Sequence, residues 1–134
     1  MKAPAVVPHP ARIMTALTAV FWQAADQGRL LLQRCQECGH RQFYPRAICR
    51  NCWSENVTWE QASGDGRIWT YTVAHQPGHP AWNDETPYVI AIVELDEGPR
   101  MLSRVIDCDR RDVTVGARVR LAAGATPPLA FTLS

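Results

Sequence analysis

Two Cys-x-x-Cys pairs are the strongest chemical signal in this sequence. The pairs are separated by ten residues and consist of Cys35, Cys38, Cys49 and Cys52. Two residues between cysteines let one tight turn present both sulfurs to the same ion, and Gly39 tolerates the left-handed backbone of such a turn. The second pair departs from this ideal, because Trp53 follows Cys52. The spacing predicts a tetrahedral four-thiolate metal site, with zinc favoured over iron, although four cysteines alone do not exclude iron.

Four thiolates would close the coordination shell of the metal. Such an ion has no open position for water or substrate, so its role is structural rather than catalytic. Structural zinc can supply on the order of 10 kcal/mol of folding free energy in a small module. A cysteine-bearing segment with few apolar side chains needs this support, and in a compact cytosolic chain the pattern favours metal over disulfides.

The remaining residues do not form a convincing catalytic constellation in the sequence. His75 and His79 could line a pocket as a pair, but such residues are more often satisfied histidines at a loop edge. Cys108 is a candidate nucleophile, yet its acidic neighbours would raise the pKa of the thiol, so we interpret it as a packed small hydrophobe. Phosphate-binding, dinucleotide-binding and nucleophile-elbow motifs are absent. We therefore expect no catalytic residues.

Arginines and aromatic residues surround the cysteines. Five arginines but a single acid lie between residues 29 and 50. Guanidinium groups suit phosphate, and rings at Phe43, Tyr44, Trp53 and Trp59 could stack a purine. This composition does not separate a nucleotide-bearing cofactor from a nucleic acid, and a merely solvated face remains open. The net charge of +1 counts against a protein that holds nucleic acid by electrostatics alone.

The elements that would position these residues are mostly strands. Ten prolines and eight glycines are too many for a mainly helical bundle. Apolar residues at helical spacing, followed by Gly28, predict a helix over 12–28 after a Pro-rich arm at 1–11. Strand patterns cover 30–32, 57–61, 67–75, 88–95, 100–105, 119–122 and 129–133. Short strands about ten residues apart predict a small closed barrel of OB-fold size.

The expected architecture is mainly β, with a helix, a zinc ribbon and a five-stranded barrel. We expect an N-terminal arm and helix at 1–28, the ribbon at 29–56 and the OB-fold at 57–134. No apolar run approaches the ~20 residues of a membrane span. Prolines and charges interrupt the N-terminal region, and no clear cleavage site follows, so we expect a cytoplasmic protein.

The order of these features resembles a known family, over about residues 21–123. The similarity includes Phe21-Trp22, the cysteine quartet, Phe43-x-Pro45-Arg46, and the run from Pro87-Tyr88-Val89 to Leu102-Ser103. The sequence is similar to acyl-CoA-associated proteins of the domain-of-unknown-function thirty-five type, which join a rubredoxin-like zinc ribbon to an OB-fold. The resemblance implies a non-catalytic accessory subunit. Its partner would be a thiolase, hydroxymethylglutaryl-CoA synthase, or an aldolase or hydratase of steroid side-chain breakdown.

The resemblance also implies CoA or acyl-CoA as a ligand. The contacts we expect for it are Phe21, Trp22, Arg41, Phe43, Arg46 and His75. Arg46 matches the Pro-Arg step of the family and is the first choice for a phosphate contact. The Phe21-Trp22 pair has a second reading, as an anchor on the protein's own core. Two other functions stay open, a single-stranded nucleic-acid-binding OB-fold module and a small enzyme that uses Cys108 or His75.

Overall fold

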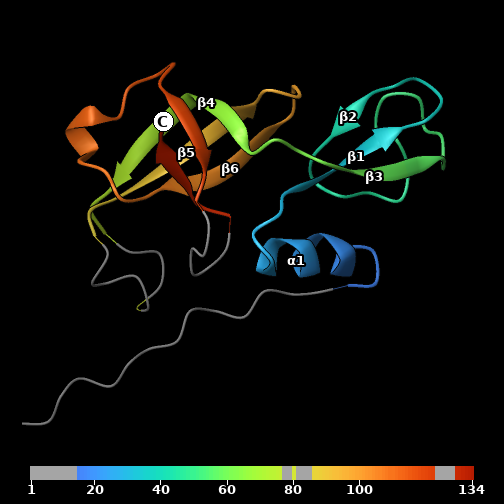
Figure 1. Cartoon of the computed structure of the whole chain (residues 1–134), viewed down its shortest axis with the longest axis horizontal. Helices are drawn as coiled ribbons and strands as arrows, with labels where there is room; N and C mark the ends of the chain where they lie inside the picture. Colours follow the sequence, from blue (N-terminus) through green and yellow to red (C-terminus); the bar gives the residue numbers. More distant parts are fainter. Residues whose placement is uncertain (1–14, 77–79, 81–85, 123–128) are drawn as a thin grey trace, which may run out of the picture.

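The computed structural model describes residues 15–76, 80, 86–122 and 129–134. A three-stranded sheet and a closed five-stranded barrel lie beside each other, and a helix lies below the link between them in Figure 1. This arrangement confirms the mainly β class. The expected arm at 1–11 lies outside the described residues. In the part that the structure describes, no helix is long and apolar enough to cross a membrane.

The helix α1 (Ala19–Asp26) is shorter than the sequence predicts. Before it, Thr15 and Thr18 form a turn in which each backbone N–H donates to the hydroxyl of the other, at 3.0 and 3.2 Å. The turn takes up residues that the pattern assigned to the helix. Gly28 ends the segment at φ +76°, as predicted. The helix buries Phe21 and two alanines, and it packs against β1.

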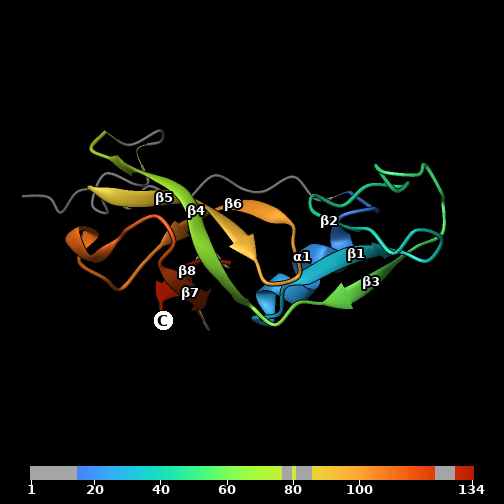
Figure 2. The ribbon, with the colours of Figure 1, turned by 90° about the horizontal axis from the view of Figure 1, so that it is seen from above.

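The ribbon sheet has the order β2-β1-β3, and both pairings are antiparallel. Its strands are β1 (Leu31–Cys35), β2 (Arg41–Gln42) and β3 (Val57–Gln61). The prediction grouped 57–61 with the OB-fold, but these residues pair with β1. The physical reason is that β1 has two edges whose backbone groups need partners. Figure 2 shows β3 along one edge of this sheet, with the chain running on from it into β4 of the barrel.

The barrel closes in the order β4-β5-β6-β8-β7, with β7 returning to β4. Its strands are β4 (Asp65–Ala74), β5 (Tyr88–Leu95), β6 (Arg100–Val105), β7 (Arg118–Leu121) and β8 (Phe131–Leu133). A short 3-10 helix, Arg110–Asp112, connects β6 to β7. Five short strands in a closed barrel are what the sequence predicts for an OB-fold, and each lies within about two residues of its predicted position.

Alternate residues of β5 face the barrel core, and β4 follows this pattern only in part. Along β5 the buried residues alternate with half-buried ones from Val89 to Leu95. The pattern in β4 predicts Ile68 and Thr70 on one face. A bulge between them shifts the register, so Ile68 pairs with buried Val93 while Thr70 pairs with Ile92 on the outer face. Gly66 allows the close approach of β4 to β5, because a Cβ there would lie 2.6 Å from a carbonyl oxygen of β5.

Candidate metal centre and ligand groove

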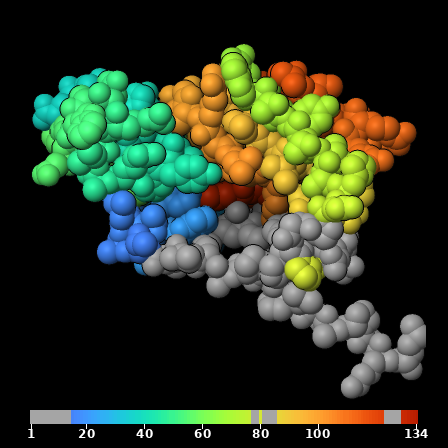
Figure 3. All heavy atoms as spheres, turned by 180° about the vertical axis from the view of Figure 1, so that it is seen from behind, coloured from blue at the N-terminus to red at the C-terminus, as the bar shows by residue number. Residues whose placement is uncertain are grey.

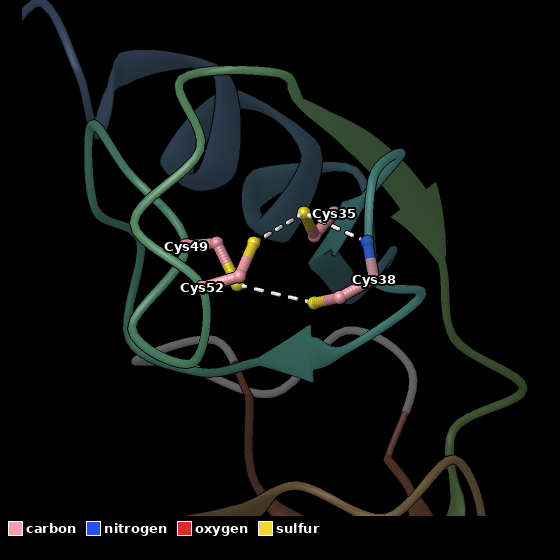
Figure 4. A group of neighbouring side chains, drawn as sticks. All are labelled: Cys35, Cys38, Cys49 and Cys52. Atoms are coloured by element: carbon pink, nitrogen blue, oxygen red, sulfur yellow. Dashed lines mark hydrogen bonds between the residues drawn. The ribbon is translucent and has the colours of Figure 1, made fainter.

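Two tight turns bring the four predicted metal ligands together. The strand β1 ends at Cys35, and the chain turns so that the N–H of Gly39 donates to the carbonyl of Cys35 at 2.9 Å. The second turn repeats this bond from Trp53 to Cys49, at 2.8 Å. All four sulfurs then lie within 4.8 Å of one another, facing a common centre (Figure 4).

The spacing of the sulfurs fits a metal ion and not disulfides. Neighbouring Sγ atoms are 3.5 Å apart for Cys35 and Cys52 and 3.6 Å apart for Cys38 and Cys49. A tetrahedron with metal–sulfur bonds of about 2.3 Å places its sulfurs about 3.8 Å apart, whereas a disulfide needs about 2.05 Å. All four cysteines are free thiols, two buried and two exposed. The donor set therefore fits a closed four-thiolate site near the surface.

Hydrogen bonds around the sulfurs favour thiolates unequally. The pKa of Cys38 is lowered to about 6, chiefly by the side chain of Asn51, whose Nδ2 lies 3.6 Å from the sulfur. The pKa of Cys52 is raised to about 12; a backbone bond at Ser54 lowers it, but the sulfur of Cys35 and burial outweigh that effect. Ionisation of one thiol thus opposes ionisation of the next. A divalent cation that binds all four relieves this repulsion.

A pair of buried glutamines fixes the loop between the two turns, and sequence reasoning missed them. Gln33 accepts from the backbone N–H of Arg46 at 2.7 Å and donates to its carbonyl at 2.8 Å. Gln42 donates to Gln33 at 2.7 Å and to the carbonyl of Ile48 at 3.1 Å, and accepts from the N–H of Arg50 at 2.9 Å. These bonds hold the segment from Phe43 to Arg50 against the sheet. A polar residue inside the apolar pattern of 30–35 was the available signal.

An apolar groove of about 410 Å³ lies where α1, the loop after β2 and the barrel meet. Its lining residues are Phe21, Trp22, Phe43, Tyr44, Tyr88, Ile90, Met101, Leu102, Ser103, Arg104 and Leu129. The ring of Phe21 is 4.9 Å from that of Trp22 and 5.4 Å from that of Phe43 between centroids. Figure 3 shows the face on which the ribbon, β6 and α1 meet. The groove is thus walled by aromatic rings from separate elements.

A second hollow, polar and about 770 Å³ in volume, lies on the ribbon side of Phe43. Its lining residues are Gly39, His40, Arg41, Gln42, Phe43, Arg50, Asn51, Glu97, Gly98, Pro99 and Arg100. Arg41 is held by Glu60 at 2.7 Å, which lowers the pKa of that carboxyl. Arg100 binds Glu94 and stacks on Trp69, at 3.7 Å from the ring centroid. Arg50 has no carboxylate partner in the described part of the chain, so its charge is available.

The structure brings together only some of the predicted ligand contacts. Phe21, Trp22 and Phe43 line the groove, and Arg41 lines the polar hollow. Phe21 is also fully buried in the core, so the alternative reading as a core anchor holds for that ring. Arg46 and His75 line neither hollow, and both are exposed. His79 lies outside the described residues.

Two arginines of the polar hollow were not among the named ligand contacts. Arg50 belongs to the arginines around the cysteines that the sequence offered for phosphate, and it directly follows the metal ligand Cys49. Arg100 enters the hollow from the turn between β5 and β6, far along the chain from the cysteines. Nothing in the local sequence indicates that this turn faces the ribbon.

Cys108 does not look like a nucleophile. Its side chain packs against the core. Burial raises the pKa of the thiol, and the carboxylates of Asp112 and Asp109 raise it further. The sequence predicts this direction from the acids alone, whereas burial is the larger cause. Apart from the cysteine quartet, no group of three or more metal-ligating side chains gathers among the described residues.

Comparisons with known proteins agree with this geometry. Residues 22–58 match the family model for the rubredoxin-like zinc ribbon domain of ChsH2, and residues 59–124 match that for its C-terminal OB-fold domain. A DUF35 domain-containing scaffold protein of Methanothermobacter thermautotrophicus is 34% identical over 81% of this chain and 82% of its own length. A probable enoyl-CoA hydratase alpha subunit of Thermomonospora curvata is 37% identical over 90% of this chain, which spans 36% of that relative.

The fold as a whole also has a solved counterpart. A chain from the structure described as Ltp2-ChsH2(DUF35) aldolase superposes with a TM-score of 0.78 at 34% sequence identity. The match covers 93% of this chain and 98% of that chain. The similarity therefore extends over both the ribbon and the barrel.

Proposed function

The chain belongs to the DUF35 family, with the zinc ribbon and OB-fold of ChsH2, and on this basis we propose that it is a non-catalytic accessory subunit of an acyl-CoA enzyme. The partner is a thiolase-like enzyme, an aldolase or a hydratase, and the subunit holds the CoA moiety for it. Two relatives support an assembly role: one is named a scaffold protein and the other a hydratase alpha subunit.

The observation that carries the ligand proposal is the meeting of two unlike hollows at Phe43. An acyl-CoA joins an apolar acyl chain, through a pantetheine arm, to a nucleotide that bears phosphates. The aromatic groove on one side of Phe43 suits the acyl chain, and the polar hollow on the other side suits the phosphates. One extended ligand laid across Phe43 would occupy both.

The charged side chains of the polar hollow determine the affinity that we expect for CoA. Arg50 supplies an unpaired guanidinium, while Arg41 and Arg100 are already bound to Glu60 and Glu94. The carboxylate of Glu97 also lines the hollow; one of its oxygens accepts from the N–H of Ser63 at 2.9 Å, and the other is buried without a partner. With a single free cation, we expect micromolar affinity for CoA rather than nanomolar.

The metal acts as a structural zinc in this proposal. By fixing Cys38 and Cys49, the ion holds both ends of the loop that carries Phe43, and Arg50 directly follows the second of these ligands. Zinc bound by four thiolates keeps the cysteines reduced and has no open position for substrate. We place the protein in the cytoplasm, where thiols persist.

Calorimetry and co-purification test the two parts separately. Zinc-loaded protein should bind acetyl-CoA with micromolar affinity, and Arg50→Gln should weaken binding about tenfold, since a charge-assisted hydrogen bond is worth about 1.5 kcal/mol or more. Arg120→Gln, an exposed change on β7, is the matched control and should bind normally. No heat with CoA or acetyl-CoA refutes the ligand part. Failure of the tagged chain to recover any acyl-CoA enzyme refutes the scaffold part.

Single-stranded nucleic acid is the second candidate, and exposed aromatic residues on the barrel favour it. Trp69 and Tyr71 on β4 are 45% and 36% exposed, as OB-fold stacking platforms require. However, Glu94 binds both Arg67 and Arg100, which removes the free cations that a phosphate track needs. Binding of a labelled single strand at about 50 mM salt that falls steeply with added salt would support this candidate. Absence of binding would end it.

A further inference from the structure

Trp53 occupies a backbone position that normally belongs to glycine. It closes the second cysteine turn at φ +67°, and the corresponding residue of the first turn is Gly39 at φ +77°. A side chain with a Cβ is strained in this left-handed region, and a bulky one is a true outlier there. The turn requires only the backbone N–H of this residue. That N–H donates to the carbonyl of Cys49 at 2.8 Å, and a glycine would supply the same hydrogen bond.

Packing among the residues that the structure describes does not compensate for this strain. The side chain of Trp53 is 76% exposed, the largest exposed fraction among the large hydrophobic residues of the described chain. Trp22 and Trp59, by contrast, pack against the core, and Trp69 lies under the guanidinium of Arg100. Backbone strain that no packing contact offsets indicates that the residue serves a function other than stabilising the fold.

The charges around Trp53 indicate what kind of surface would receive it. Arg46 and Arg50 lie in the same loop, are exposed, and have no carboxylate partner among residues 15–76, 80, 86–122 and 129–134. Glu55 is the one acid between Arg46 and the end of this loop at residue 56. Within this loop, two exposed guanidinium groups thus precede Trp53, and one carboxylate follows it, so the loop carries a net positive charge. Tryptophan and arginine are the residue types that most often dominate the binding energy of protein interfaces.

We propose that Trp53 is the anchor by which the ribbon binds its partner enzyme, with the indole in an apolar pocket whose rim is acidic. This inference rests on the scaffold part of the proposed function and names the surface that performs it. The four sulfurs hold the turn, so the ring is presented in a fixed direction before binding. A preorganised anchor loses less conformational entropy on association than a flexible one.

The variant Trp53→Gly tests this with two readouts, because the stability of the protein should rise while its affinity for the enzyme falls. The probe is the acyl-CoA enzyme that co-purifies with the tagged chain, purified and recombined with each variant. Trp53→Gly should keep one equivalent of metal and raise the melting midpoint by roughly 2–6 °C, because the strain is removed. The Kd for the enzyme should rise about 30-fold or more, as expected for an interface anchor. A purely structural tryptophan would instead lower the midpoint.

Two control variants separate the anchor from general effects. Val115→Ser removes another exposed apolar side chain, 66% exposed and located between β6 and β7, and should leave the Kd unchanged. Arg46→Gln should weaken binding less than Trp53→Gly and should reduce the dependence of binding on salt, because the proposal pairs this exposed guanidinium with the acidic rim.

Each outcome decides one proposal. If wild-type protein forms no complex, the scaffold proposal fails and this inference falls with it. If the complex forms and Trp53→Gly binds within threefold of wild type, the inference is overturned while the scaffold proposal stands. A lowered midpoint overturns it as well. If the substitution abolishes binding of a single strand but not of the enzyme, the ring serves nucleic acid instead.

Discussion

The buried pair Gln33 and Gln42 gives the sharpest prediction for the stability of the ribbon. Gln33 is 3% exposed and makes three hydrogen bonds, two to the backbone of Arg46 and one to Gln42. Gln33→Leu keeps nearly the same volume but removes all three. Gln42 keeps its bond to the carbonyl of Ile48, whereas the N–H and carbonyl of Arg46 lose their partner.

The size of the effect follows from counting these groups. Each lost bond costs about 1 kcal/mol net, and a backbone group left buried without a partner costs about 1–3 kcal/mol. We therefore expect Gln33→Leu to destabilise the ribbon by about 3 kcal/mol, which is roughly a hundredfold in its unfolding equilibrium. The loop that carries Phe43 should loosen with it, so affinity for acyl-CoA should fall too.

Release of metal during denaturant titration measures the ribbon separately from the barrel. Wild type, Gln33→Leu and the control Gln36→Leu are compared at one free-zinc concentration, because bound metal itself shifts stability. Gln36 is exposed and its side chain makes one hydrogen bond, to the hydroxyl of Thr58 at 2.7 Å, so loss of that bond should cost less than about 1 kcal/mol. If the two variants release metal at the same denaturant concentration, the reasoning about the amide pair is wrong.

Three further predictions concern the barrel and the fifth cysteine. Hydrogen bonds from Arg67 and then Arg100 lower the pKa of Glu94, so its stabilisation is present above the ordinary value and is lost as the pH falls through the lowered one. Glu94→Gln should therefore flatten the fall of the melting midpoint between about pH 5 and pH 3, and an unchanged acid slope would contradict this. Gly66→Ala should destabilise the barrel by about 1–3 kcal/mol, because the new Cβ meets a β5 carbonyl at 2.6 Å; a neutral effect in thermal melts would show that the strands separate easily. Burial and acidic neighbours raise the pKa of Cys108, so a thiol reagent at neutral pH should label the metal-loaded protein slowly, and removal of the metal should make four more cysteines available to it. Rapid labelling of one thiol in the loaded protein would restore Cys108 as a nucleophile.

Local sequence patterns were sufficient to predict most of the strands and the end of the helix. The strand alternation in 88–95 and the glycine at 28 depend on neighbours within the same segment, and both predicted the structure well. The cysteine spacing was likewise local, since each pair occupies one turn. Local patterns did not predict features that tertiary contacts decide. The bulge after Ile68 depends on the neighbouring strand β5, and the pairing of β3 depends on the free edge of β1.

The ligand site was only partly predictable for the same reason. Phe21, Trp22 and Phe43 meet because α1 folds back under the ribbon, and their aromatic character was visible in the sequence. Arg100 reaches the polar hollow from the β5–β6 turn, and Gln33 acts through a loop thirteen residues away. Contacts at such separations leave no pattern in a single sequence.

The closed metal site is the claim on which the scaffold role depends, and X-ray absorption at the zinc edge of the purified protein, with metal content measured in parallel, tests it most directly. We predict one zinc per chain surrounded by four sulfurs at about 2.3 Å. A water oxygen in place of one sulfur would leave the metal open to chemistry. A metal-free protein with two disulfides would have no metal site at all. Either result would contradict the account.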